Sequence, residues 1–163
     1  MASIAEQREI LPTNTRNEVA QQLQSSLVDQ IDLALQAKQA HWNVRGLGFR
    51  AVHLHLDEII ESTREASDEI AERIAAIGVA ADGRAATVAQ SSELEPFPAG
   101  IISVQEAIRR ISDQMATCST SLRLRIKTIG DDDLISQDLL IGICRTLEKQ
   151  LWMLESQAAD AAP

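Results

Sequence analysis

The chain has 163 residues, which is enough for one well-packed domain and short for two. Aromatic residues make up only 2%, tyrosine is absent, and alanine, leucine, isoleucine, glutamine, glutamate and arginine dominate, a composition typical of helical proteins. The formal net charge of −9 opposes a broad phosphate-binding surface and favours a protein that attracts cations.

The first half of the chain predicts two long helices. A helix over about residues 17–43 is indicated by apolar residues at four-residue spacing, namely Leu23, Leu27, Ile31 and Leu35, and Thr15 or Asn17 could cap its start. The sequence "RGLG" ends it. A second helix is predicted over about residues 50–77 and is closed by Gly78. We expect the two helices to form an antiparallel hairpin.

The second half predicts a long connection and two more helices: a crossover over 78–102 with a short helix near 84–90, a third helix over 103–129 and a fourth over 134–157. This order predicts an all-α, ferritin-like four-helix bundle with a long crossover between helices two and three. We expect one domain over residues 1–163, with short flexible tails at about 1–15 and 158–163. Cys118 and Cys144 lie inside apolar helical patterns and are interpreted as buried thiols.

The second helix carries a stripe of polar residues, spaced 4, 4, 3, 4 and 4 apart, that falls on one face roughly 100° wide: His53, Asp57, Glu61, Arg64, Asp68 and Glu72. Such a stripe is usually a solvated surface with charge pairs. Here, however, His41 and His53 lie six residues on either side of Leu47, at the centre of the hairpin turn, so antiparallel helices place them opposite each other. His41, His53 and Asp57 can therefore converge as two nitrogens and an oxygen, a set suited to iron, zinc or manganese.

The other acidic pair of the stripe, Asp68 and Glu72, cannot reach that set within one chain, because the two pairs are centred about 22 Å apart along the helix. The midpoint between positions 53 and 72 is 62.5, as is the midpoint between positions 57 and 68. An antiparallel copy of the helix crossing near Ser62 and Thr63, which are small, would unite the two half-sites. The spacing predicts a two-fold dimer with two equivalent shared sites.

The segment "KQAHWNVRG", the following "F", and the "H", "DE", "D" and "AER" at positions 53, 57–58, 68 and 71–73 closely resemble the motif of the Dps miniferritins. The resemblance extends over the four-helix pattern to the ending "LEKQLWMLES". It implies a ferroxidase site with paired irons between two-fold related subunits. His41, His53 and Asp57 would come from one chain, and Asp68 and Glu72 from the other. It also implies a hollow dodecamer that oxidises Fe(II) to Fe(III), preferably with hydrogen peroxide rather than O2, stores the ferric mineral, and protects DNA and the cell from oxidative damage.

Four residues beside these ligands need separate interpretations. Trp42 adjoins His41 and could intercept stray oxidising equivalents, or it could be a half-buried packing residue. His55 points away from the stripe and is expected at the surface. Lys38 and Arg73 match the family motif and are assigned to salt bridges or to supporting the ligands.

The acidic sequence "GDDDLISQD" begins the fourth helix, where carboxylates are favoured by the helix dipole and can act as caps. In the family that the chain resembles, acidic residues near this point line three-fold pores. Asp131, Asp133 and Asp138 are therefore candidates for a cation entry pore, with simple capping as the alternative.

Two other functions are compatible with parts of the sequence. An architectural DNA-binding protein would fit the family resemblance, but residues 1–16 contain only Arg8 and Arg16 as cations and "AADAAP" contains none, so we expect weak or absent DNA binding. A metal-assisted amide hydrolase could use the same site, although no HExxH motif or nucleophile elbow supports it.

A conventional ferritin would need ExxH pairs within one bundle, and the positions three before each histidine are Lys38, Arg50 and Val52. No apolar run approaches a membrane span, and the N-terminus lacks the pattern of a signal peptide. We expect a cytoplasmic protein with no membrane partner, and association with the nucleoid is an open alternative.

Overall fold

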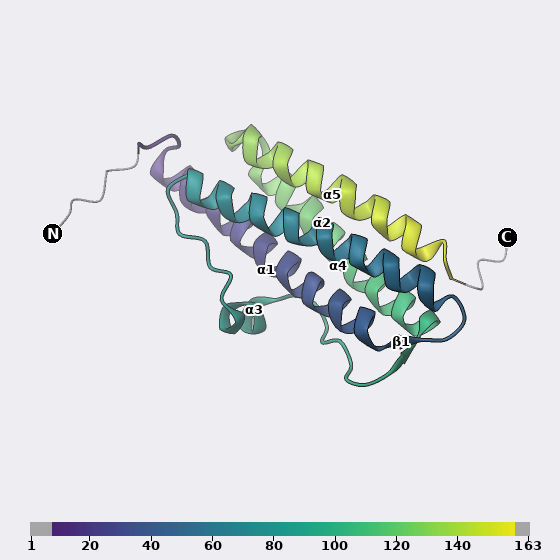
Figure 1. The fold of residues 1–163 in the computed structure, drawn as a ribbon. Coiled ribbons are helices and arrows are strands. Elements are labelled where there is room, and N and C mark those ends of the chain that lie inside the picture. The colour runs from purple at the N-terminus through teal and green to yellow at the C-terminus, as the bar shows by residue number, and fades with distance from the viewer. Residues whose placement is uncertain (1–7, 159–163) are drawn as a thin grey trace.

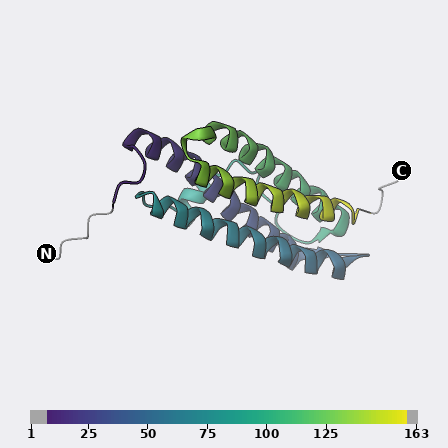
Figure 2. The ribbon, with the colours of Figure 1, turned by 90° about the horizontal axis from the view of Figure 1, so that it is seen from above.

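The computed structural model describes residues 8–158, so residues 1–7 and 159–163 of the expected tails lie outside the described part. Four long helices lie side by side (Figures 1 and 2): α1 (Thr13–Asn43), α2 (Phe49–Ala76), α4 (Val104–Ile129) and α5 (Leu134–Glu155). The crossover between α2 and α4 carries a short helix, α3 (Ala85–Ser91), which packs on α1. The predicted all-α bundle of ferritin-like topology is confirmed. In the described residues, no helix combines the length and apolar character needed to cross a membrane.

The start of α1 differs from the prediction. The helix begins at Thr13, and the cap position is held by Pro12, whose carbonyl accepts the Arg16 N–H at 2.9 Å. Proline suits this place because its fixed φ matches a helix start and its missing N–H would have had no helical partner. The predicted caps, Thr15 and Asn17, are wrong because both residues lie inside the helix. Residues 13–15, expected in a tail, are helical.

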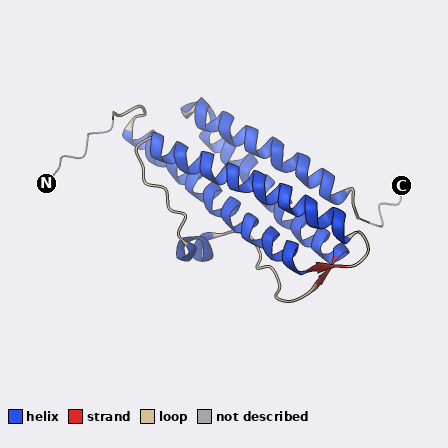
Figure 3. Ribbon diagram, viewed as in Figure 1, coloured by secondary structure: helices blue, strands red, loops and turns tan. Residues whose placement is uncertain are grey.

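Two short strands close one end of the bundle (Figure 3): β1 (Val44–Arg45), directly after α1, and β2 (Ile102–Ser103), directly before α4. They pair in parallel, with Val44 opposite Ile102. Strands of two residues give no readable sequence pattern, so this pairing was not predicted. It fixes the end of α1 against the start of α4, at the end of the bundle where the α1–α2 turn lies.

The core is continuous and aliphatic, and the predicted stripe of α1 only partly faces it. Leu23 and Leu27 are buried, Ile31 is partly buried, and Leu35 is 57% exposed. A four-residue spacing advances about 40° at each step on a helix with 3.6 residues per turn, so the last of four such residues has rotated out of the core. The interpretation of Cys118 and Cys144 as buried thiols is confirmed, since both are free and buried.

A buried ion pair joins α1, α4 and the crossover. Arg125 Nη1 lies 2.7 Å from Asp29 Oδ2, and the two side chains are only 7% and 3% exposed. The backbone N–H of Glu93, in the crossover, donates to Asp29 Oδ1 at 3.3 Å, and the Glu93 carboxylate lies 3.3 Å from the Arg125 guanidinium. Burial raises the pKa of Asp29 although Arg125 acts in the opposite direction. The pair therefore anchors the crossover at a substantial desolvation cost.

Candidate metal centre

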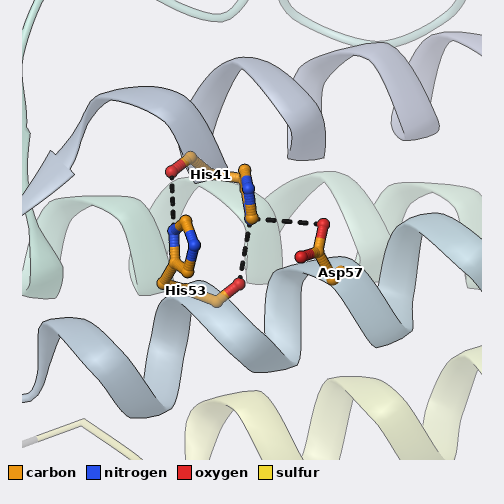
Figure 4. Close-up of side chains that lie close together, drawn as sticks. All are labelled: His41, His53 and Asp57. Carbon is orange, nitrogen blue, oxygen red and sulfur yellow. Dashed lines mark hydrogen bonds and ion pairs between the residues drawn. The ribbon is translucent and has the colours of Figure 1, made fainter.

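His41 of α1 and His53 and Asp57 of α2 lie together across the helical hairpin (Figure 4). One possible ligand atom from each residue lies within 4.8 Å of the others. This is the convergence predicted from the turn-centred spacing of the histidines. No other group of three or more such residues close enough to hold a metal ion occurs among residues 8–158.

Crossed hydrogen bonds orient the two imidazoles. His41 Nδ1 lies 3.0 Å from the carbonyl oxygen of His53, and His53 Nδ1 lies 3.1 Å from the carbonyl oxygen of His41. Because a carbonyl can only accept, each Nδ1 carries the proton and each Nε2 keeps a lone pair for a metal ion. The rings stack with centroids 3.7 Å apart, and Phe49 packs against His53. The rings are therefore set in place before any ion binds.

The Asp57 carboxylate lies between Lys38 and His41. Its Oδ1 lies 2.7 Å from Lys38 Nζ and 3.3 Å from His41 Nδ1, while Oδ2 has no partner among the described residues. The hydrogen bond from Lys38 lowers the pKa of Asp57, so the carboxylate is charged and able to bind a cation at neutral pH. Lys38 thus makes a salt bridge, as interpreted from the sequence.

The second acidic pair stays apart from this group. Asp68 and Glu72 lie farther along α2 and are exposed, and their side chains make no hydrogen bond or ion pair with residues 8–158. One chain therefore presents three converging possible ligands and, on the same helix, two carboxylates that have no partner within the described part. This is the arrangement that a site shared between two chains requires.

The expected role of Thr63 at the helix crossing is wrong. Thr63 is 2% exposed, and its hydroxyl donates to the carbonyl of Ile59 at 2.8 Å, so it faces the inside of the bundle. The exposed residues at the centre of the stripe are Glu61 and Arg64, whose positions also have 62.5 as their midpoint. The mirrored spacing thus includes a third pair, and this pair is of opposite charge.

Two residues beside the ligands differ from expectation. Trp42 is 67% exposed, so the interpretation as a half-buried packing residue is wrong. His55, expected at the surface, is only 5% exposed, with Nε2 2.7 Å from Gln150 Oε1 and Nδ1 2.7 Å from Gln157 Nε2. His55 lies about 200° around the helix from His53, which turns it towards α5. It therefore links α2 to α5 and to Gln157, near the C-terminal end of the described residues.

Of the three pore candidates, Asp131 and Asp138 are exposed, whereas Asp133 is buried. Asp133 caps α5 by accepting from Ile135 N, and it also accepts from the Ser136 hydroxyl and from Arg73 Nη2, the latter at 2.7 Å. The capping alternative therefore holds for Asp133, and the salt-bridge role of Arg73 is confirmed. Burial by itself would raise the pKa of Asp133, but the hydrogen bonds from Ser136 and Arg73 outweigh it and the pKa is lowered.

This lowered pKa predicts a pH-dependent contribution to stability. A carboxyl whose pKa is lower in the folded chain stabilises the fold fully above its unfolded value and loses the effect as pH falls through the folded value. Asp133→Asn keeps a capping side chain but removes the charge, so it should lower the free energy of unfolding at pH 7 by about 1–3 kcal/mol. The difference from wild type should shrink below roughly pH 4 in a series of urea titrations. A difference that does not change with pH would contradict this assignment.

Comparisons with known proteins agree with this geometry. The family described as "Ferritin-like domain" matches residues 20–162. The fine tangled pili major subunit of Haemophilus ducreyi is 35% identical over 90% of this chain and 77% of its own length. The DNA protection during starvation protein of Agrobacterium fabrum is 32% identical over 92% of this chain and 93% of its own length. Dps from Microbacterium arborescens, in its high iron form, is 32% identical with a TM-score of 0.88 and covers 94% of this chain and 100% of its own.

Proposed function

Because the chain belongs to the ferritin-like family and, within it, to the Dps proteins, we propose that it is a ferroxidase and iron-storage miniferritin. It oxidises Fe(II), preferably with hydrogen peroxide, at di-iron sites shared between two-fold related subunits. The ferric product is kept as mineral inside a hollow dodecamer, which protects DNA and the cell. The observation that carries the proposal is the half-set of His41, His53 and Asp57 on a helix that also presents the unpartnered Asp68 and Glu72.

The ligand chemistry supports oxidation at this place. Imidazole nitrogens and carboxylate oxygens both bind Fe(II), and the negative ligands stabilise Fe(III) more than Fe(II). Two irons together supply the two electrons that one hydrogen peroxide molecule needs: two Fe(II), one H2O2 and two protons give two Fe(III) and two water molecules. A paired transfer releases no hydroxyl radical. Protection from peroxide and storage of iron are thus the same reaction.

The partner subunit completes the site through the mirrored spacing. With α2 crossing its copy at position 62.5, His53 faces Glu72 of the partner subunit and Asp57 faces Asp68 of the partner subunit. Glu61 then faces Arg64 of the partner subunit. Because the two-fold axis repeats this contact, the centre of the interface gains two Glu–Arg ion pairs. The charge pattern favours antiparallel self-association of this helix.

Other surface residues take roles around that reaction. Trp42, exposed beside His41, is placed to intercept oxidising equivalents that escape the irons. Asp131 and Asp138 are the exposed candidates for a cation entry pore, while Asp133 serves the start of α5. We propose weak or absent binding to duplex DNA, because the net charge is −9 and the chain offers no cluster of lysines near either end.

Mixing two inactive variants tests the shared site. One variant carries His53→Ala with Asp57→Ala, and the other carries Asp68→Ala with Glu72→Ala, so each homodimer has lost two of the five ligands at both sites. A mixed dimer has one site without these four ligands and one site that is wholly native. If unfolded chains are mixed and reassembled at random, half of the dimers are mixed and about a quarter of the wild-type rate of rapid Fe(II) oxidation should return.

The assay is stopped-flow absorbance after anaerobic Fe(II) loading and addition of hydrogen peroxide. The control is the same reassembly performed with each variant alone, which should stay inactive. Mass spectrometry of differently tagged chains establishes that mixed dimers have formed. Mixed dimers without recovered activity would mean that each chain builds its site alone.

A further inference from the structure

The two cysteines of the chain are protected to different degrees by burial. Cys118 of α4 is 1% exposed and lies in the aliphatic core, where burial is the main cause of the raised pKa of its thiol. Cys144 of α5 is 5% exposed and lines a groove of about 320 Å³ between α4 and α5. None of the proposed ferroxidase ligands lines this groove. Cys144 is therefore the thiol that a small oxidant in the groove can approach.

A carboxylate lies at the centre of a hydrogen-bond network beside Cys144. Glu148 Oε1 accepts from Arg123 Nε and from the Ser119 hydroxyl, both at 2.6 Å, and Glu148 Oε2 accepts from Arg123 Nη2 at 2.8 Å. The bonds from Arg123 and Ser119 hold the pKa of Glu148 at about 2, so this side chain is charged at neutral pH. Cys144 Sγ lies 3.4 Å from Glu148 Oε1. Because a carboxylate can only accept, the thiol donates to it and keeps its proton.

The same carboxylate occupies the two donors that could otherwise stabilise a thiolate. The Ser119 hydroxyl has a single proton and donates it to Glu148, although its oxygen lies 3.8 Å from Cys144 Sγ. The Arg123 guanidinium interacts electrostatically with Cys144, but its two hydrogen bonds go to Glu148. A thiolate at this position would face a negative charge. Burial and the Glu148 carboxylate accordingly raise the pKa of the Cys144 thiol.

We propose that Glu148 keeps Cys144 in its unreactive thiol form and so protects the oligomer from the peroxide that it consumes. The reaction prevented is attack of the Cys144 thiolate on hydrogen peroxide, since the thiolate is the nucleophile. In that reaction the sulfur forms a bond to one oxygen, the O–O bond breaks and hydroxide leaves. The sulfur is oxidised to sulfenic acid, and the departing oxygen is reduced to hydroxide. The choice of peroxide as the oxidant rests on the proposed function.

The test uses the full chain in its assembled form with Cys118→Ser, which leaves Cys144 as its only cysteine. Glu148→Gln keeps the size of the side chain, removes its charge and frees Arg123 to pair with the sulfur. The ultraviolet absorbance of the thiolate is followed as the pH is raised, and this measurement needs no reagent to reach the groove. The pKa of Cys144 should be lower in Glu148→Gln than in the parent chain.

The second measurement is the rate at which hydrogen peroxide oxidises Cys144 at neutral pH in the absence of iron. Mass spectrometry counts the chains that have gained oxygen. We expect the rate in Glu148→Gln to rise about threefold or more, because each tenfold gain in thiolate is partly offset by a lower nucleophilicity of the sulfur.

Two further variants separate the charge of Glu148 from its contribution to packing. Arg123→Ala added to Glu148→Gln removes the cation together with the carboxylate, so both the pKa and the oxidation rate should return close to the parent values. Glu155→Gln is the matched control, because it makes the same change at an exposed carboxylate of the same helix, and it should alter neither quantity. A loosened fold would speed oxidation in the double variant as well, so only the effect of charge predicts the reversal.

An unchanged pKa of Cys144 in Glu148→Gln would overturn the proposal, as would a lower pKa without faster oxidation. A lower pKa that Arg123→Ala does not reverse would also overturn it. Because the thiol is titrated and oxidised without iron, these outcomes do not depend on the shared ferroxidase site. Absence of rapid Fe(II) oxidation in wild type would refute the proposed function and leave the result for the thiol unchanged.

Discussion

Reversing the charge of Glu61 is expected to separate the two-fold dimer and to abolish rapid Fe(II) oxidation. In the mirrored arrangement, Glu61→Arg places two arginine side chains against each other at both positions related by the two-fold axis. Like charges facing each other across a contact cost several kcal/mol, so the dimer dissociation constant should rise about a hundredfold or more. Arg64→Glu alone should have the same effect, because it places two glutamates against each other.

The reciprocal double variant, Glu61→Arg with Arg64→Glu, restores opposite charges and should recover both assembly and oxidation. Analytical ultracentrifugation and light scattering measure assembly, with the dodecamer expected for wild type and for the double variant. The matched control is Glu58→Arg, which makes the same charge change on an exposed position of α2 outside the mirrored set. If the double variant stays as dissociated as the single variants, the antiparallel crossing at 62.5 is incorrect.

The largest loss of fold stability is expected from Arg125→Ala. This change leaves the Asp29 carboxylate buried without its cation, which should lower the free energy of unfolding by about 3–5 kcal/mol. Arg123→Ala is the matched control on the same helix, since the Arg123 side chain is 66% exposed and its pair with Glu148 should contribute about 1 kcal/mol or less.

Replacing both buried charges gives the complementary result. Asp29→Leu with Arg125→Met removes the unpaired charge together with its partner and should leave stability near the wild-type value. Urea unfolding at one fixed protein concentration measures these differences, because assembly also contributes to stability. If the double variant is as unstable as Arg125→Ala, the ion pair contributes more to the free energy of unfolding than the neutralisation of one buried charge by the other.

The periodic spacing of residues in the sequence was enough to predict the helices and part of the candidate site. The four long helices follow from repeating apolar residues and from Gly and Pro between them, which are local properties of the chain. The meeting of His41 and His53 follows from their equal distance to the hairpin turn. The isolation of Asp68 and Glu72 follows from the rise of a helix, which sets a distance that one chain cannot bridge.

Other features depended on which helix face meets which neighbour. Leu35 and Thr63 were misplaced because a regular spacing does not state where the core lies around the helix axis. His55 is buried only because Gln150 of α5 and Gln157 lie against it. These two residues are 95 and 102 positions farther along the chain. The two-residue strands are defined by each other and have no pattern of their own.

The sequence by itself therefore determined the helices, their order, the histidine pair and the separation of Asp68 and Glu72 from that pair, because these depend on helical geometry along one chain. Only the tertiary structure decided the Asp29–Arg125 anchor, the cap and ion pair of Asp133, and the burial of His55 against Gln150 and Gln157. Each of these depends on how burial removes water from a polar group and which distant group replaces it. That replacement is a property of packed neighbours, which spacing along the chain does not encode.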